Sequence, residues 1–168
     1  RGMGRGLGLE GWFPMSMAPA GAGLRGGHVA AGVKLGLAEA IRCGVTTVAD
    51  YMQLQPVKGL GKLELDIAKD MGVRMVYGRG YRDIGKKELV EKAEDVFADV
   101  TALKEEFEGD GMYRVWLAPA AGWGASLELL KATREYADRN ATPILMHMFE
   151  TGTDDNISRE RNGNRAYS

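Results

Sequence analysis

Residues 44–50 read Gly-Val-Thr-Thr-Val-Ala-Asp, which is a helix-ending glycine, a run rich in β-branched residues and a terminal carboxylate. β-Branched side chains favour extended backbone, so residues 45–49 are predicted to form a buried strand. Upstream, apolar residues recur every four positions and mark one face of a helix: Val29, Val33, Leu37 and Ile41. A helix that leads directly into a buried strand is typical of α/β proteins with a parallel sheet.

The same order of helix and strand recurs three times along the chain. Helices are expected over residues 63–71, 87–107 and 126–139, the last with Ser126 as its N-cap. Strands are expected to follow them over residues 73–77, 113–117 and 143–147, with the Gly-Arg-Gly of residues 78–80 as a turn. Four such units predict an α/β fold and about half of a (β/α)₈ barrel, which needs about 250 residues. An open, flavodoxin-like α/β domain is the alternative.

The two ends of the chain lack this alternation. Residues 1–27 are rich in glycine and are expected to form a long loop, and residues 151–168 are expected to form a polar loop. Residues 28–150 contain the repeated helix–strand units.

The composition is that of an ordinary globular chain. Its 168 residues are 45% hydrophobic and 27% charged, with a formal net charge of -1. The absence of a basic excess argues against nucleic-acid binding, and no polybasic stretch or long apolar run indicates a membrane partner. Cys43 is the only cysteine, so no intrachain disulfide can form, and a cytoplasmic location is expected. Cys43 itself is expected to be an inert core thiol.

A histidine and a glutamate follow the last predicted strand. Residues 143–151 read Pro-Ile-Leu-Met-His-Met-Phe-Glu-Thr, so His147 ends the strand and Glu150 lies three positions further on. Parallel strands present functional groups at their carboxyl ends. Neutral imidazole binds zinc and iron, and a carboxylate beside the metal can move protons. A purely structural histidine is the alternative, because a catalytic zinc usually needs three protein ligands.

Four segments resemble, in the right order, the amidohydrolase superfamily of metal-dependent hydrolases. Residues 38–50 are similar to the helix and second strand of that family, and residues 117–119 with 126–130 to its fourth strand and following helix. Residues 143–150 resemble its fifth strand, which typically ends in His-x-x-Glu, and residues 7–12 resemble the loop after its first strand. The nearest branch contains cytosine, guanine and S-adenosylhomocysteine deaminases and the triazine chlorohydrolases.

The resemblance implies a central fragment with strands 2 to 5 of the family barrel. It implies hydrolytic deamination of a small nitrogen heterocycle, with one zinc or iron ion activating water. His147 would be the metal ligand and Glu150 the catalytic carboxylate. Trp123 and Trp12 are candidate contacts for a planar substrate. The other ligands of the family lie outside this sequence, so the segment alone is expected to be inactive.

The resemblance is incomplete, and three further interpretations stay open. The family often has a histidine after the fourth-strand proline, where residues 119–123 read Pro-Ala-Ala-Gly-Trp. A non-catalytic half-barrel that forms a homo-oligomer through its exposed sheet edges is the alternative to an enzyme. His28 is interpreted as a cap or surface residue, and for Asp50 a supporting or helix-capping role and contact with the metal both stay open.

Overall fold

The computed structural model describes residues 4–121, 124–148, 150, 156–157 and 159–160, and its centre is a parallel sheet. The strands β1 (Thr47–Met52), β2 (Arg74–Tyr81) and β3 (Tyr113–Pro119) pair in the order β1–β2–β3. This confirms the predicted α/β class and the parallel sheet. The predicted turn at residues 78–80 is wrong, because these residues continue β2.

The predicted strand over residues 143–147 is reduced to one parallel bridge between Leu117 and Ile144. Two hydrogen bonds hold it: the Leu117 N–H donates to the Pro143 carbonyl (3.0 Å), and the Leu145 N–H donates to the Leu117 carbonyl (2.8 Å). Pro143 has no N–H to contribute, which helps to explain why the pairing is short. The chain nevertheless continues the sheet beyond β3 in the parallel direction.

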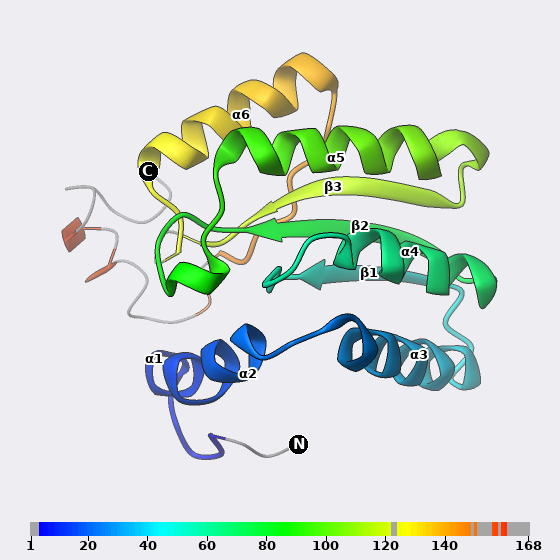
Figure 1. The fold of residues 1–168 in the computed structure, drawn as a ribbon, viewed down its shortest axis with the longest axis horizontal. Coiled ribbons are helices and arrows are strands. Elements are labelled where there is room, and N and C mark those ends of the chain that lie inside the picture. Colours follow the sequence, from blue (N-terminus) through cyan, green and yellow to red (C-terminus); the bar gives the residue numbers. More distant parts are fainter. Residues whose placement is uncertain (1–3, 122–123, 149, 151–155, 158, 161–168) are drawn as a thin grey trace.

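A helix precedes each strand, and the helices follow one another around the sheet in chain order (Figure 1). They are α3 (Gly26–Arg42), α4 (Leu60–Asp70), α5 (Ala93–Phe107) and α6 (Leu127–Asn140). Ser126 caps α6 as predicted, accepting a hydrogen bond from the Leu129 N–H at 3.0 Å.

The helix expected over residues 87–107 is divided in two. A 3₁₀ turn, η2 (Lys87–Leu89), is separated from α5 by extended backbone, and a second 3₁₀ turn, η3 (Glu108–Asp110), follows α5. The Glu91 N–H donates to the Arg82 carbonyl (2.9 Å), which ties the extended stretch to the end of β2.

The expectation of a loop over residues 1–27 is wrong for most of the described part. Residues 9–22 form three short helical pieces: α1 (Leu9–Trp12), the π-helix η1 (Phe13–Met17) and α2 (Ala18–Ala22). Tertiary packing stabilises them, because their apolar side chains meet residues from the loops after β1 and β2. This small cluster contains Ala18, Leu54 and Leu89, with Phe13, Met17 and Leu24 packed against it.

The main core lies between the sheet and its helices. Alternate residues of β2 and β3 point into it, including Met75, Tyr77 and Val115, which are at most 1% exposed. The opposite face of β2 has a glycine near the carboxyl end of the strand. A Cβ at Gly80 would lie 2.2 Å from the Met52 carbonyl oxygen, so only glycine allows β1 and β2 to approach this closely.

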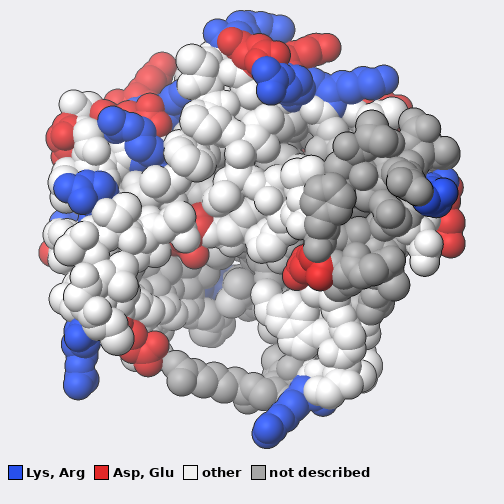
Figure 2. Space-filling view, turned by 180° about the vertical axis from the view of Figure 1, so that it is seen from behind, with Lys and Arg blue, Asp and Glu red and all other residues white. Residues whose placement is uncertain are grey.

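Charged side chains of both signs lie mainly around the edge of the face shown in Figure 2, and uncharged side chains cover most of its centre. Among the described residues, no helix is both long enough and apolar enough to cross a membrane.

An ion-pair cluster lies on the helix-covered face of β2, near the carboxyl end of the strand. Arg79 is 5% exposed; its Nε donates to Asp99 (2.7 Å), and its terminal nitrogens donate to Glu91 (2.7 and 2.9 Å). One guanidinium therefore joins β2, the segment before α5, and α5 itself. The two carboxylates depend on this cation for compensation of their charge.

Arg79→Met is expected to lower the free energy of unfolding by about 2–3 kcal/mol, because it leaves two partly buried carboxylates without their cation. Urea denaturation of the two proteins measures this difference. Arg134→Met is the matched control, since Arg134 pairs with Asp138 on the exposed surface of α6, and it is expected to leave the midpoint unchanged. An Arg79→Met midpoint equal to that of the control would contradict a stabilising role for the cluster.

Candidate functional site

His147 lies where the carboxyl ends of the strands meet. Its ring centroid is 4.4 Å from that of Tyr51, and the two ring planes meet at 84°, an edge-to-face contact. Tyr51 is near the end of β1, and its hydroxyl donates to the carbonyl of Pro119, the last residue of β3, at 2.7 Å. Tyr51 thus connects the ends of β1 and β3 with the segment that carries His147.

The pKa of Tyr51 is influenced by two charged residues nearby. Burial raises its pKa well above the ordinary value of a phenol; the positive charge of Arg82 opposes this, and the negative charge of Glu150 adds to it. The hydroxyl therefore stays protonated and serves as a hydrogen-bond donor to Pro119. Glu150, three residues after His147, is close enough to act electrostatically on the same tyrosine.

His147 and Glu150 are both solvent-exposed, so neither is a core residue in the described part of the chain. The imidazole has ring nitrogens of the kind that zinc and iron bind. No group of three or more His, Cys, Asp or Glu side chains suited to a metal occurs within the described residues. The donor set present here is therefore compatible with a contribution to a metal site and does not form one by itself.

Arg82, directly after β2, is a neighbour of this site that the sequence analysis missed. It is 3% exposed, and its guanidinium lies 4.8 Å from the ring centroid of Phe13. Burial lowers its pKa, and the field of Tyr51 partly opposes that change. The contact brings the N-terminal helices over the carboxyl ends of the strands.

Of the two tryptophans predicted to contact a substrate, the structure describes only Trp12. Trp12 lies in α1, with its ring edge-on to Phe13 at a centroid distance of 6.5 Å, so it belongs to the helical segment that meets Arg82. A substrate contact by Trp12 stays a prediction. Trp123 lies outside the described residues.

A glycine of β2, Gly78, pairs with Tyr51 and lies on the same face of the sheet. A Cβ added at Gly78 would lie 3.0 Å from Leu145 Cδ2 and 3.3 Å from Ala118 Cβ. The glycine therefore allows Leu145 to pack against the sheet two positions before His147. This packing holds the backbone that leads to the candidate ligand.

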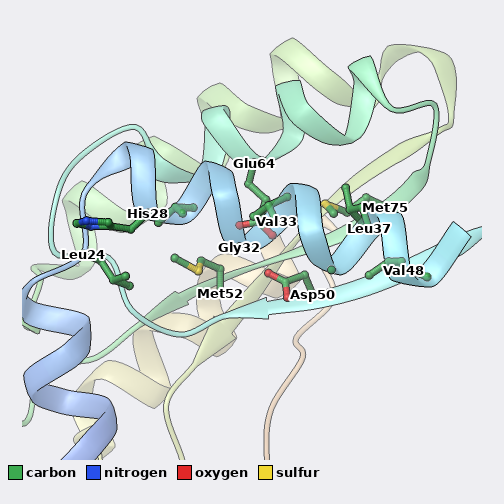
Figure 3. A pocket seen from close by; sticks show the side chains of 13 residues that line it. Leu24, His28, Gly32, Val33, Leu37, Val48, Asp50, Met52, Glu64 and Met75 are labelled. Atoms are coloured by element: carbon green, nitrogen blue, oxygen red, sulfur yellow. The ribbon is translucent and has the colours of Figure 1, made fainter. Parts of the chain in front are cut away.

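Three other residues were assigned roles from the sequence. His28 is confirmed as a capping residue, because its Nδ1 accepts a hydrogen bond from the Arg25 N–H at the start of α3 (3.2 Å). Asp50, for which a supporting role and metal contact were both open, lies on the opposite side of β1 from Tyr51 and beside Glu64 (Figure 3), which favours the supporting role. The prediction of a buried Cys43 is wrong: the thiol is exposed, because α3 ends at Arg42 and Cys43 is its C-cap.

A parallel sheet with a helix before each strand, and polar side chains gathered at the carboxyl ends, defines a sector of an α/β barrel. The sequence profile of the amidohydrolase family matches residues 2–166. The chain belongs to the amidohydrolase family.

Curated relatives include several deaminases. The chain is 31% identical to a 5'-deoxyadenosine deaminase of Methanobrevibacter smithii, over 99% of this chain and 37% of that protein. It is 29% identical to an 8-oxoguanine deaminase of Pseudomonas aeruginosa, over 79% of this chain and 32% of that protein. The chain therefore spans about a third of the length of these relatives.

Solved structures show the same fold. An adenosine deaminase from Xanthomonas campestris with bound zinc has a TM-score of 0.85 at 23% identity, over 99% of this chain and 36% of that chain. A mutant atrazine chlorohydrolase from Arthrobacter aurescens, in complex with zinc and atraton, has a TM-score of 0.82 at 21% identity, over 95% of this chain and 38% of that chain. These matches confirm the predicted partial (β/α)₈ barrel.

Proposed function

We propose that this chain is a segment of a metal-dependent hydrolase that removes an amino group from a nitrogen heterocycle. The observation that carries the proposal is the exposed His147 imidazole, held against Tyr51 where the parallel strands end. Membership of the amidohydrolase family and the deaminase relatives support it. The substrate is a small molecule, and the complete protein has a cytoplasmic location.

His147 would hold the metal through one ring nitrogen, and other segments of the complete protein would supply the remaining ligands. A bound zinc or iron ion would supply Lewis acidity and a nucleophilic water at neutral pH. Glu150 would accept a proton on its carboxylate and deliver it to the leaving amine. Tyr51 keeps the imidazole edge oriented through its ring and is itself fixed by Pro119.

The names of the relatives define a first set of substrates. These proteins are called 5'-deoxyadenosine, 8-oxoguanine and 5-methylthioadenosine/S-adenosylhomocysteine deaminases. All of these substrates contain a purine ring with an exocyclic amino group, which a hydrolytic deaminase would release as ammonia. A flat ring of this kind suits aromatic contacts, which is the role proposed for Trp12 and Trp123.

The decisive experiment uses the complete protein and this 168-residue segment side by side. Ammonia release from the four purines above is measured after loading with zinc or ferrous iron, together with the metal content of each protein. Turnover is expected for the complete protein and none for the segment. A complete protein that binds neither metal in stoichiometric amount would refute the proposal.

A second candidate is a non-catalytic half-barrel that self-associates. It is favoured by the position of β1 at the end of the sheet order, because no strand among the described residues pairs with its outer edge. Size-exclusion chromatography of the segment distinguishes the two: a metal-free oligomer favours self-association of the segment, and a monomer contradicts it.

A further inference from the structure

Arg82 faces the candidate site from the end of β2. Side chains alternate along a strand, and Tyr81, just before it, points to the helices, where its hydroxyl shares a hydrogen bond with Thr133 (2.7 Å). Arg82 therefore lies on the other face, the face of Gly78, whose partner in the register with β1 is Tyr51. Its positive charge is close enough to Tyr51 to oppose the rise in the pKa of that phenol.

Three segments of the chain enclose the Arg82 side chain, so that the residue is 3% exposed. The centroid of the Phe13 ring lies 4.8 Å from Cζ of the guanidinium. The backbone approaches from two loops, because a Cβ added at Gly124 would lie 3.5 Å from Cζ, and one added at Gly85 would lie 3.7 Å from Nη1. A side chain enclosed in this way is better placed to hold segments together than to bind a substrate directly.

Hydrogen bonds fix the loop that carries Arg82. The Ile84 N–H, two residues further on, donates to the Gly124 carbonyl (3.2 Å). The Asp83 carboxylate accepts a hydrogen bond from the Ser126 N–H, at the start of α6 (2.8 Å). The guanidinium therefore projects from a base in which the loops after β2 and β3 are joined.

The N-terminal helical segment, residues 9–22, is attached to this part of the molecule by two kinds of contact. One is apolar packing against Leu54 and Leu89, from the loops after β1 and β2. The other is the contact of Arg82 with the face of the Phe13 ring. Figure 1 shows α1 and α2 on the side of the molecule toward which the strands point, so the segment lies near the carboxyl ends of the strands.

The contact with Phe13 depends on the shape of the arginine side chain. A guanidinium is flat and keeps its charge when it is buried, so it can stack on an aromatic ring with one face and pack against backbone with the other. The ammonium group of lysine is compact and strongly hydrated, and it does not reproduce this arrangement. Lysine at this position would therefore keep the charge and lose the stacking.

We propose that Arg82 is a positioning residue, which holds residues 9–22 near the carboxyl ends of the strands through the Phe13 ring and so fixes where Trp12 meets the substrate. Trp12 precedes Phe13, and their rings meet edge-on with 6.5 Å between centroids, so a displaced Phe13 would move Trp12 with it. The effect on the substrate rests on the proposed function. The attachment of the segment by Arg82 does not depend on it.

A double-mutant cycle in the metal-loaded complete protein tests whether Arg82 acts through Phe13. Arg82→Lys and Phe13→Leu are each expected to raise KM for the best substrate among the four purines about tenfold, while kcat and the metal content stay near the wild-type values. The double variant is expected to have the same KM as the single variants, because all three lack the same contact. Phe13→Tyr keeps an aromatic face and is expected to keep the wild-type KM.

Arg74→Lys is the matched control, because Arg74 is exposed at the opposite end of the same strand, and it is expected to leave KM unchanged. Effects on KM that multiply in the double variant would show that Arg82 acts independently of Phe13, and they would overturn the proposal. A fall in kcat at unchanged KM in either single variant would also overturn it.

Hydrogen exchange of the complete protein provides a measurement that needs no turnover. The backbone amides of residues 9–22 are expected to exchange about tenfold faster in Arg82→Lys and Phe13→Leu than in the wild type, Phe13→Tyr or Arg74→Lys, because the segment has lost one attachment. Unchanged exchange would overturn the proposal even in an active deaminase. Faster exchange in a protein without turnover would support the attachment and refute the proposed function alone. Phe13 is only half-buried, so Phe13→Leu carries both tests if Arg82→Lys does not fold.

Discussion

Replacing His147 with alanine is expected to lower kcat/KM for deamination in the complete enzyme by about three orders of magnitude or more, equivalent to about 4 kcal/mol of transition-state stabilisation. Catalytic zinc usually has three protein ligands, so the loss of one weakens metal binding and leaves the metal poorly positioned. The variant also removes the ring that packs against Tyr51. Steady-state kinetics and the metal content of the purified variant measure the two consequences together.

His28→Asn provides the control, because His28 is the other histidine of the chain and caps the start of α3. It is expected to keep metal content and turnover near the wild-type values. If His147→Ala retains stoichiometric metal and wild-type kcat/KM, His147 is a structural residue and the proposed metal site is wrong.

Glu150→Gln is expected to lower kcat by about 10²–10⁴-fold while the metal content stays the same. Glutamine has nearly the same shape as glutamate, but it cannot accept or deliver a proton. The variant therefore tests whether the Glu150 carboxylate transfers a proton in the reaction. Steady-state kinetics and metal analysis of the metal-loaded complete protein measure kcat and the metal content.

Glu94→Gln is a suitable control for that experiment, because Glu94 is exposed in the first turn of α5, remote in sequence from His147 and Glu150. It should leave kcat and the metal content unchanged. An unchanged kcat in Glu150→Gln, or a loss of metal equal to that in His147→Ala, would contradict the proposed proton-transfer role.

The regular part of the fold could be predicted because local signals and tertiary packing agree there. The β-branched run before Asp50 gives β1, and the Ser126 cap gives the start of α6. Residues 9–22 could not be predicted, because their glycines are typical of loops and their helical form depends on contacts with Leu54 and Leu89. The short pairing of residues 143–147 likewise depends on which backbone N–H and carbonyl groups of β3 are available for hydrogen bonds.

The candidate site could be predicted only where a residue's position in its strand was informative. His147 ends an apolar segment and was found for that reason. Tyr51 and Arg82 also lie at or just after strand ends, and that position was the available signal. Their partners Pro119 and Phe13 are far away in sequence, so the contacts themselves could not be derived. The facing of Glu64 and Asp50 depends in the same way on how α4 packs against β1.

Because Gly80 lies so close to the Met52 carbonyl, the register between β1 and β2 is also restricted while the barrel assembles. Sliding β2 by one residue along β1 would bring Arg79 or Tyr81 to that point, and either side chain would collide with the backbone of its neighbour. The same displacement would turn the Arg79 guanidinium away from its carboxylates and toward the barrel interior. Misaligned pairings are thus sterically penalised while the chain folds, and the surviving alignment is the one that sets Tyr51 opposite Gly78.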